Sequence, residues 1–202
     1  LVLGASGMIG SAMLRVLSKN PMLDVFGSVR MASNPAPFLN SRATKVKVLD
    51  LGNPDQLSIM FDKVSPDIVV NCVGLTKHLP NGNDPISSIT LNALLPHRLA
   101  ELCKIFDARL IHISTDCVFS GKKGNYCEGD RSDAEDVYGK SKYFGEVAGH
   151  GLLTLRTSTI GHEVGTRFGL LEWFLAQEFC KGYKNAKFSG LTSVELARVV
   201  RD

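Results

Sequence analysis

Short apolar runs alternate along the chain with segments whose apolar residues recur at helical spacing. The strand-length runs lie near residues 1–4, 24–29, 45–49, 67–73, 109–114 and 152–156. The helical segments lie near residues 8–19, 55–64, 85–106, 136–149, 168–181 and 192–201. Such alternation is typical of βαβ units around a parallel sheet. The pattern therefore predicts an α/β fold with a doubly wound, Rossmann-like parallel sheet.

The composition of the chain is that of an ordinary globular protein. Its 202 residues are 44% hydrophobic and 21% charged, enough for one α/β domain with a sizeable core. A dispersed net charge of +3 argues against nucleic acid as a partner, and the apolar runs are too short to span a membrane. Five cysteines without a CxxC pair indicate free thiols in a reducing compartment, the cytoplasm, and no metal site.

A glycine-rich turn joins the first predicted strand to the first predicted helix. Gly4, Gly7 and Gly10 have the spacing GxxGxxG, which differs from the commonest dinucleotide fingerprint, GxGxxG. The first two would permit a tight turn close to a ligand, and the third would let helix and strand pack. The helix N-terminus presents unpaired N–H groups to a pyrophosphate. We therefore expect a dinucleotide to contact Gly4, Ser6, Gly7, Met8 and Ile9.

The end of the second strand indicates which dinucleotide binds. An acid there would hold a ribose 2′-hydroxyl, whereas an arginine accommodates a 2′-phosphate. Asp24 opens the strand and so points away from the site, whereas Arg30 closes it at the carboxyl edge. The arginine could instead be an ordinary surface residue. We expect NADP(H) in preference to NAD(H).

Two further strand ends are expected to contact the cofactor. Asp50 and Leu51 follow the third strand and could flank the adenine, although Asp50 could equally cap a loop. Val73 and Gly74 follow the fourth strand, where a close backbone approach would suit the glycine. The alternation ends near residue 157, so we expect an NAD(P)-binding domain over 1–157. Residues 158–202 are expected to begin a substrate-binding portion in a chain that is cut at both ends.

Tyr138 and Lys142 lie four residues apart in DVYGKSKYFGE and so share a helix face. A free tyrosine has a pKa of ~10, which is high for proton exchange at neutral pH, and a nearby ammonium would lower it. The lysine could also bind the cofactor ribose. On an ordinary amphipathic helix the same pair would be one packed tyrosine and one solvated lysine. Behind a glycine turn, the pair predicts hydride exchange between a nicotinamide and a carbonyl or alcohol.

A hydroxyl at the end of the fifth strand completes the predicted catalytic group. Thr115 could donate to the reacting oxygen beside Tyr138, and Ser114 is the alternative because adjacent strand residues face opposite ways. Asp116, the next residue, is expected on the substrate side.

Asn92 lies four residues before Pro96 in the long segment 85–106. Proline has no N–H, so the Asn92 carbonyl loses its helical partner and must find another. We expect a kink at 92–96 and a water that joins Asn92 to Lys142 as a proton outlet. A simple break between two shorter helices is the alternative.

Three more residues are candidates with weaker support. His78 follows the fourth strand and Arg156 closes the sixth, so both could reach the substrate, the arginine at a phosphate. Each could instead be an ordinary solvated residue. His112, inside the fifth strand, is expected as a packed side chain and not as a catalyst.

At these residues the chain resembles the extended short-chain dehydrogenase/reductase family, most closely its dTDP-4-dehydrorhamnose reductase-like branch. The resemblance covers nearly all of the chain and includes GASGMIG, VVNCVG, HISTDCVFSGKKGNY, DVYGKSKYFGE and LRTSTIG. It implies catalysis by Thr115, Tyr138 and Lys142, with hydride passing from NADPH to a nucleotide-linked 4-keto-sugar. It also implies a role in cell-surface polysaccharide synthesis. A homodimer is a separate expectation, and the sequence leaves the oligomeric state open.

Two departures from the branch leave the sugar open. Cys117 and Thr159 stand where the branch typically has tyrosine and an aromatic residue. The related sugar-nucleotide dehydratases carry an acid where Cys117 lies, so the resemblance argues against dehydration. A UDP-sugar epimerase and a non-catalytic, cofactor-binding regulatory subunit are the alternatives.

Overall fold

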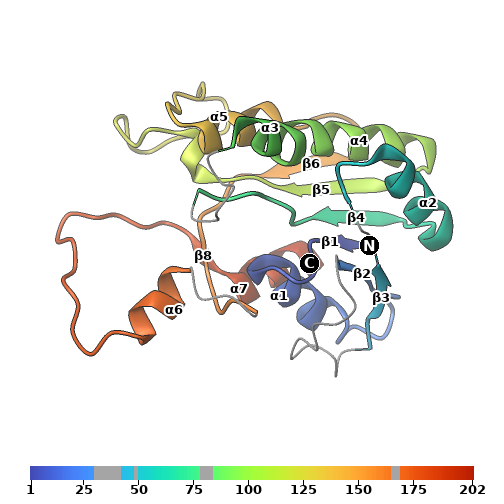
Figure 1. The fold of residues 1–202 in the computed structure, drawn as a ribbon, viewed down its shortest axis with the longest axis horizontal. Coiled ribbons are helices and arrows are strands. Elements are labelled where there is room, and N and C mark those ends of the chain that lie inside the picture. Colours follow the sequence, from blue (N-terminus) through green and yellow to red (C-terminus); the bar gives the residue numbers. More distant parts are fainter. Residues whose placement is uncertain (30–41, 48–49, 78–83, 165–168) are drawn as a thin grey trace.

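The computed structural model describes residues 1–29, 42–47, 50–77, 84–164 and 169–202. Its centre is a parallel sheet in the order β3-β2-β1-β4-β5-β6 (Figure 1). The strands are β1 (Val2–Leu3), β2 (Phe26–Val29), β3 (Thr44–Lys47), β4 (Ile68–Asn71), β5 (Arg109–Ile113) and β6 (Leu152–Leu155). This strand order is that of a doubly wound dinucleotide-binding fold, so the predicted fold class is confirmed.

Helices cover both faces of the sheet (Figure 1). One face carries α1 (Met8–Leu17) and α7 (Ser193–Arg201). The other carries α2 (Pro54–Val64), α3 (Pro85–Ser88), the π-helical segment η2 (Ile89–Leu94), α4 (Leu95–Ile105) and α5 (Val137–Phe144). A short helix, α6 (Leu170–Leu175), lies away from the sheet. No helix among the described residues is long and apolar enough to span a bilayer.

Each face of the sheet has its own hydrophobic core. On the α2 and α4 side, Phe61, Leu99 and Leu110 are fully buried in one cluster. On the α1 and α7 side, Leu14 and Leu196 are buried in a second cluster. Burial on both faces explains why the central strands read as continuous apolar runs and not as alternating ones.

Local signals set several helix boundaries. Asn53 caps α2 by accepting the amides of Asp55 (2.9 Å) and Gln56 (3.4 Å), as its polar and proline-containing start predicted. Asp136 caps α5 by accepting the Gly139 amide. The segment 136–149 was predicted to be helical throughout, but α5 ends at Phe144. Helix α6 is likewise shorter than the predicted 168–181.

The strand order reverses between β1 and β4, which pair in parallel. The chain leaves β1 toward β2 on one side and leaves β4 toward β5 on the other. In doubly wound sheets the carboxyl ends at this reversal form the ligand crevice. The glycine turn follows β1 and the segment 72–77 follows β4, so both lie at that crevice.

The C-terminal part is only partly separate from the sheet. Two short strands that the sequence did not predict, β7 (Thr159–Ile160) and β8 (Leu191–Thr192), pair in parallel. Two-residue strands carry no periodic signal, which explains why they were missed. Leu196 and Ala197 of α7 join the same buried cluster as α1. Helix α7 therefore belongs to the packing of the main sheet, and the division at residue 157 stays a prediction.

Candidate active site

The glycine turn is packed as its spacing predicted. Gly4 has φ +73°, in the left-handed region that favours glycine, and its amide donates to Ser28 Oγ (3.2 Å). A Cβ on Gly4 would lie 3.2 Å from the Cys72 carbonyl, so the turn contacts the chain after β4. A Cβ on Gly10 would lie 2.2 Å from the Gly4 oxygen. Any side chain there would push helix and turn apart.

Helix α1 begins at this turn without a side-chain cap. Its N-cap is Gly7, and no acidic side chain lies in its first turn. Ser6 and Gly7 are exposed, and Met8 and Ile9 are half-buried at the helix start. An uncapped helix N-terminus favours an anion. The turn therefore suits the pyrophosphate of a dinucleotide, as the sequence predicted.

Tyr138 lies on α5 with its phenol close enough to Thr115 for the threonine side chain to lower the phenol pKa. Thr115 Oγ1 accepts the Cys117 amide (3.1 Å) and donates to Asp116 Oδ1 (3.4 Å). The alternative, Ser114, donates to Glu146 Oε1 (2.9 Å). The structure therefore places Thr115, and not Ser114, beside the phenol.

The prediction that an ammonium lowers the Tyr138 pKa is wrong for this structure. Burial raises the pKa of Tyr138 to about 12, the nearby Thr115 side chain opposes the rise, and Cys117 and Asp116 add to it. The physical reason is where the amine of Lys142 points. Its Nζ donates to the Ile113 carbonyl (2.7 Å), on β5.

Lys142 is itself deeply buried, with 3% of its surface exposed. Burial lowers its pKa from 10.5 to about 8, while Glu146 and Cys72 act in the opposite direction. Because Cys72 also borders Gly4, the amine lies close to the chain that lines the crevice. Tyr138 and Lys142 thus share a helix face, but their polar ends contact different residues of the β5 segment.

Asn92 is fully buried, and its side chain holds two elements together. Its Oδ1 accepts the Leu75 amide (2.8 Å), and its Nδ2 donates to the Leu75 carbonyl (3.0 Å) and to Ser141 Oγ (3.1 Å). The side chain therefore joins the segment after β4 to α5.

The segment stays helical through Pro96, with the π-helical segment η2 directly before α4, so the two separate helices of the alternative are not present and the kink stays a prediction. The Asn92 carbonyl oxygen would lie 1.9 Å from a Cβ on Gly145, so it faces the end of α5. The water relay from Asn92 to Lys142 stays a prediction, and the hydrogen bonds of the amine run to β5.

Two glycines of α5 were not recognised from the sequence. A Cβ on Gly139 would lie 2.3 Å from the Cys117 carbonyl, and one on Gly145 would meet Asn92 as described. Helix α5 is therefore held close to its neighbours at both ends. The available signal was glycine at two positions of a helical pattern, where it costs about 1 kcal/mol relative to alanine and usually has a packing reason.

The remaining cofactor candidates lie at the carboxyl edge with different contacts. Asp50 Oδ1 accepts the Gly52 amide (2.8 Å), which is the loop-capping alternative left open by the sequence. Leu51 packs on the core cluster of α2 and α4. Val73 donates its amide to Asn71 Oδ1 (3.1 Å), and Gly74 is exposed. Their contacts with a cofactor stay predictions.

The substrate candidates are less strongly supported. Asp116 is exposed beside Thr115, at the mouth of the site. Arg156 binds Glu146 through Nε (2.8 Å) and Nη2 (2.7 Å) and lies over the Phe119 ring. Because the guanidinium is already engaged by these contacts, few of its N–H groups remain available to bind a phosphate. Arg30 and His78 lie outside the described residues.

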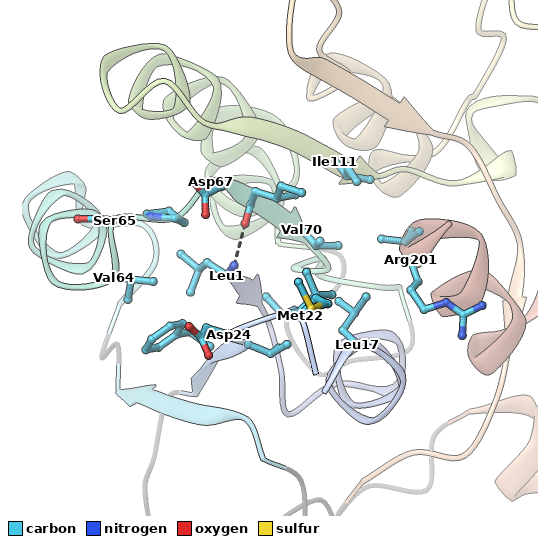
Figure 2. Close-up of a pocket in the computed structure, with 17 residues that line it drawn as sticks. Leu1, Leu17, Met22, Asp24, Val64, Ser65, Asp67, Val70, Ile111 and Arg201 are labelled. Carbon is cyan, nitrogen blue, oxygen red and sulfur yellow. Dashed lines mark hydrogen bonds between the residues drawn. The ribbon is translucent and has the colours of Figure 1, made fainter. Parts of the chain in front are cut away.

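A cavity of about 500 Å³ lies at the opposite edge of the sheet (Figure 2). Asp24 and Asp67 line it where they precede β2 and β4, at the amino ends of the strands, and the Leu1 amino group donates to the Ile68 carbonyl beside it (2.7 Å). None of the candidate site residues lines it. The position of Asp24 agrees with the prediction that it points away from the cofactor.

Comparison with known proteins identifies the family. Residues 1–170 match the family model described as RmlD substrate binding domain. The dTDP-4-dehydrorhamnose reductase of Burkholderia thailandensis is 31% identical over 173 residues, which are 83% of this chain and 52% of that protein. The chain thus spans about half the length of this relative.

Solved structures agree with this match. The structure of a hypothetical dTDP-4-dehydrorhamnose reductase from Sulfolobus tokodaii has a TM-score of 0.77 and 26% identity, covering 98% of this chain and 69% of its own. That of a dTDP-4-dehydrorhamnose reductase from Bacillus anthracis in complex with NADP has a TM-score of 0.61 and 23% identity, covering 80% and 55%. The chain belongs to the RmlD substrate binding domain family.

Proposed function

We propose that this chain is the cofactor-binding and catalytic part of an NADPH-dependent reductase of a nucleotide-linked 4-keto-sugar. The observation that carries the proposal is that the Tyr138 phenol lies close to Thr115, at the carboxyl end of β5. The glycine turn supports the proposal. Helix α1 begins there without a side-chain cap, so its N-terminus favours a pyrophosphate, and the turn packs too closely on Gly10 to admit a side chain at that position.

Tyr138 is the proton donor in this proposal. With a pKa of about 12 its phenol keeps its proton at neutral pH, as reduction of a ketone requires. Thr115 can donate a second hydrogen bond to the same substrate oxygen, where negative charge develops. NADPH, when bound, would supply the hydride to the carbonyl carbon. Lys142 would bind the ribose hydroxyls and replace the proton that Tyr138 gives up.

The finer assignments rest on sequence and similarity. We favour NADPH over NADH because Arg30 directly follows, in the sequence, the last residue of β2, and the similar Bacillus anthracis protein is described with NADP. A dTDP-linked keto-sugar follows from the name of the Burkholderia relative, and a role in polysaccharide synthesis follows from the substrate class. Cys117 and Thr159 leave the sugar itself open.

The surroundings of the enzyme are also part of the proposal. All five cysteines are free in the structure, as predicted, which fits a reducing compartment such as the cytoplasm. Residues 158–202 would begin the substrate-binding portion. A homodimer stays a prediction.

The test uses the full-length protein with NADPH and a panel of 4-keto nucleotide sugars, with loss of nicotinamide absorbance as the readout. Tyr138→Phe is expected to lower kcat by about 10²–10⁴-fold with NADPH affinity retained, because it removes only the transferred proton. Tyr143→Phe, an exposed tyrosine on the same helix, is the matched control and should keep full activity.

The outcomes separate the alternatives. Undiminished turnover in Tyr138→Phe would contradict the proposal. Tightly retained NAD with no net oxidation of added NADPH would indicate an epimerase. Cofactor binding without any turnover would indicate a regulatory subunit.

A further inference from the structure

A line of buried polar groups runs behind the proposed active site, from the end of β4 to α5. Asn71 on β4 and His112 on β5 are paired in register, and neither has any exposed surface. Lys142 of α5 lies at the far end of the line with 3% of its surface exposed. Buried polar groups persist only where their hydrogen bonds are satisfied, so the direction of each bond in the line can be worked out.

The backbone sets the first direction. The Val73 amide can only donate, and its partner at 3.1 Å is therefore the carbonyl oxygen of the Asn71 side chain. This leaves Asn71 Nδ2 facing His112 Nδ1 at 3.0 Å. The nitrogen of a side-chain amide can donate hydrogen bonds but cannot accept them, so His112 Nδ1 must be the acceptor. A neutral His112 then carries its single hydrogen on Nε2.

The second direction concerns the amine. His112 Nε2 lies 3.4 Å from Lys142 Nζ, which also donates to the Ile113 carbonyl. An ammonium has three N–H donors and no acceptor. A protonated Lys142 would therefore place a donor against the Nε2–H donor of His112, which is unfavourable. A neutral amine has a lone pair that can accept this hydrogen. The arrangement therefore favours the deprotonated form of Lys142.

The surrounding groups act on both partners. Burial lowers the Lys142 pKa to about 8, whereas Glu146 on the same helix and Cys72 after β4 raise it. Burial also lowers the His112 pKa to about 2, with further lowering by Lys142 and by His97 on α4. The imidazole therefore stays neutral at any pH at which the protein would work.

We propose that His112 is a positioning residue for Lys142. Asn71 orients the His112 ring so that the Nε2–H group faces the Lys142 amine. This contact holds the amine against β5 and favours loss of a proton from the amine. The consequence for catalysis rests on the proposed function. An amine that exchanges its proton near neutral pH can return one to Tyr138 after each turnover, and a permanently charged ammonium cannot.

A competing arrangement makes the inference testable. If the side-chain amide of Asn71 were flipped, so that its oxygen faced His112, the ring would carry its hydrogen on Nδ1. His112 Nε2 would then accept a hydrogen bond from the Lys142 ammonium. The Val73 amide would then face a donor and lose its acceptor, which is unfavourable for a partly buried group. The two arrangements differ in the position of one hydrogen.

The first measurement is nitrogen-15 NMR of the histidine rings in the unmodified protein. His112 should be the ring whose signals do not titrate between about pH 5 and 9, and its spectrum should show the hydrogen on Nε2. A hydrogen on Nδ1, or a charged ring at pH 7, would overturn the inference. This measurement requires no turnover, so its failure is distinct from failure of the proposed function.

The second measurement is the pKa of Lys142, followed by NMR of carbon-13-labelled lysine and assigned with Lys142→Met. His112→Gln supplies a carbonyl that can accept from the ammonium, so the Lys142 pKa should rise by about 1 unit. His150→Gln changes an exposed histidine away from this line and should leave it unchanged. An unchanged value in His112→Gln would refute the role.

A third variant imposes the opposite hydrogen arrangement. In Asn71→Asp the ionised carboxylate can only accept, with one oxygen from Val73 and with the other from His112, so the ring must carry its hydrogen on Nδ1. The Lys142 pKa should rise, and a ring that keeps its hydrogen on Nε2 would contradict the inference. In active full-length protein the pH profile of kcat should move with the Lys142 pKa. If the NMR results hold but no keto-sugar is reduced, the proposed function fails and the positioning role stands.

Discussion

Replacing Lys142 by methionine should make the fold more stable at neutral pH. The side chain is 3% exposed, and burial lowers its pKa from 10.5 to about 8. Each unit of pKa shift corresponds to about 1.36 kcal/mol, so holding the buried ammonium at pH 7 costs roughly 3 kcal/mol. Methionine has a similar length and no charge, and it removes this cost.

Two lost hydrogen bonds reduce the gain. The Ile113 carbonyl loses the donor at 2.7 Å, and the His112 ring loses the amine that faces it. Each lost hydrogen bond costs about 0.5–1 kcal/mol net, so the two together cost about 1–2 kcal/mol and a net stabilisation of about 1–2 kcal/mol is expected at pH 7.

The pH dependence is the sharper part of the prediction. Between pH 8 and 10.5 the unfolded chain binds more protons at Lys142 than the folded chain does, so the stability of the unmodified protein rises with pH in that window. The Lys142→Met variant lacks this rise. Its advantage should therefore be complete below pH 8, shrink as the pH increases, and become a deficit of about 1–2 kcal/mol above pH 10.5, where only the lost hydrogen bonds remain.

Urea unfolding of both proteins across this pH range measures the difference directly from the midpoints and slopes. Lys140→Met is the matched control: Lys140 is exposed on the same helix, so its replacement relieves no burial and the difference should be flat with pH. A Lys142→Met difference that is also flat, or one that grows as the pH rises, would refute the reasoning.

Three further substitutions test the geometry of the site. Gly145→Ala should lower the melting temperature by roughly 6–12 °C through a clash with the Asn92 carbonyl at 1.9 Å, whereas Gly129→Ala, in open space, should not. Thr115→Val should lower kcat by about 10²-fold, and Thr115→Ser should restore most of it; equal activity in both would contradict the hydroxyl's role. Gly10→Ala should weaken NADPH binding at least ~10-fold by fluorescence titration, and unaltered affinity would argue against the glycine turn as the cofactor site.

The parts of the fold and site that could be predicted are those encoded over short stretches of chain. Alternating periodicity located the strands and helices, and parallel pairing follows from that alternation. The glycine spacing and the four-residue separation of Tyr138 and Lys142 are likewise local signals. They placed both groups at the carboxyl edge of the sheet because a βαβ connection brings each helix start to that edge.

Side-chain direction within the site could not be predicted in this way. The helical spacing shows that Lys142 shares a face with Tyr138, but its amine is directed by Ile113 and His112, which lie about 30 residues earlier. Their position depends on the register of β5 against β4. The sign of the Tyr138 pKa shift was missed for the same reason, because burial comes from packing that a motif does not show.

The placement of α5 shows how this long-range geometry is built. Pro96 shows that the Asn92 carbonyl lacks its usual helical partner, but not that this carbonyl faces Gly145, at the end of α5. At the other end of α5, Gly139 approaches the Cys117 carbonyl closely enough that a Cβ would lie at 2.3 Å. Tyr138 and Lys142 lie next to these two contacts. Their distances from β5 are therefore set by two residues without side chains, so a chain that kept both catalytic groups and lost either glycine would keep the motif and lose the site.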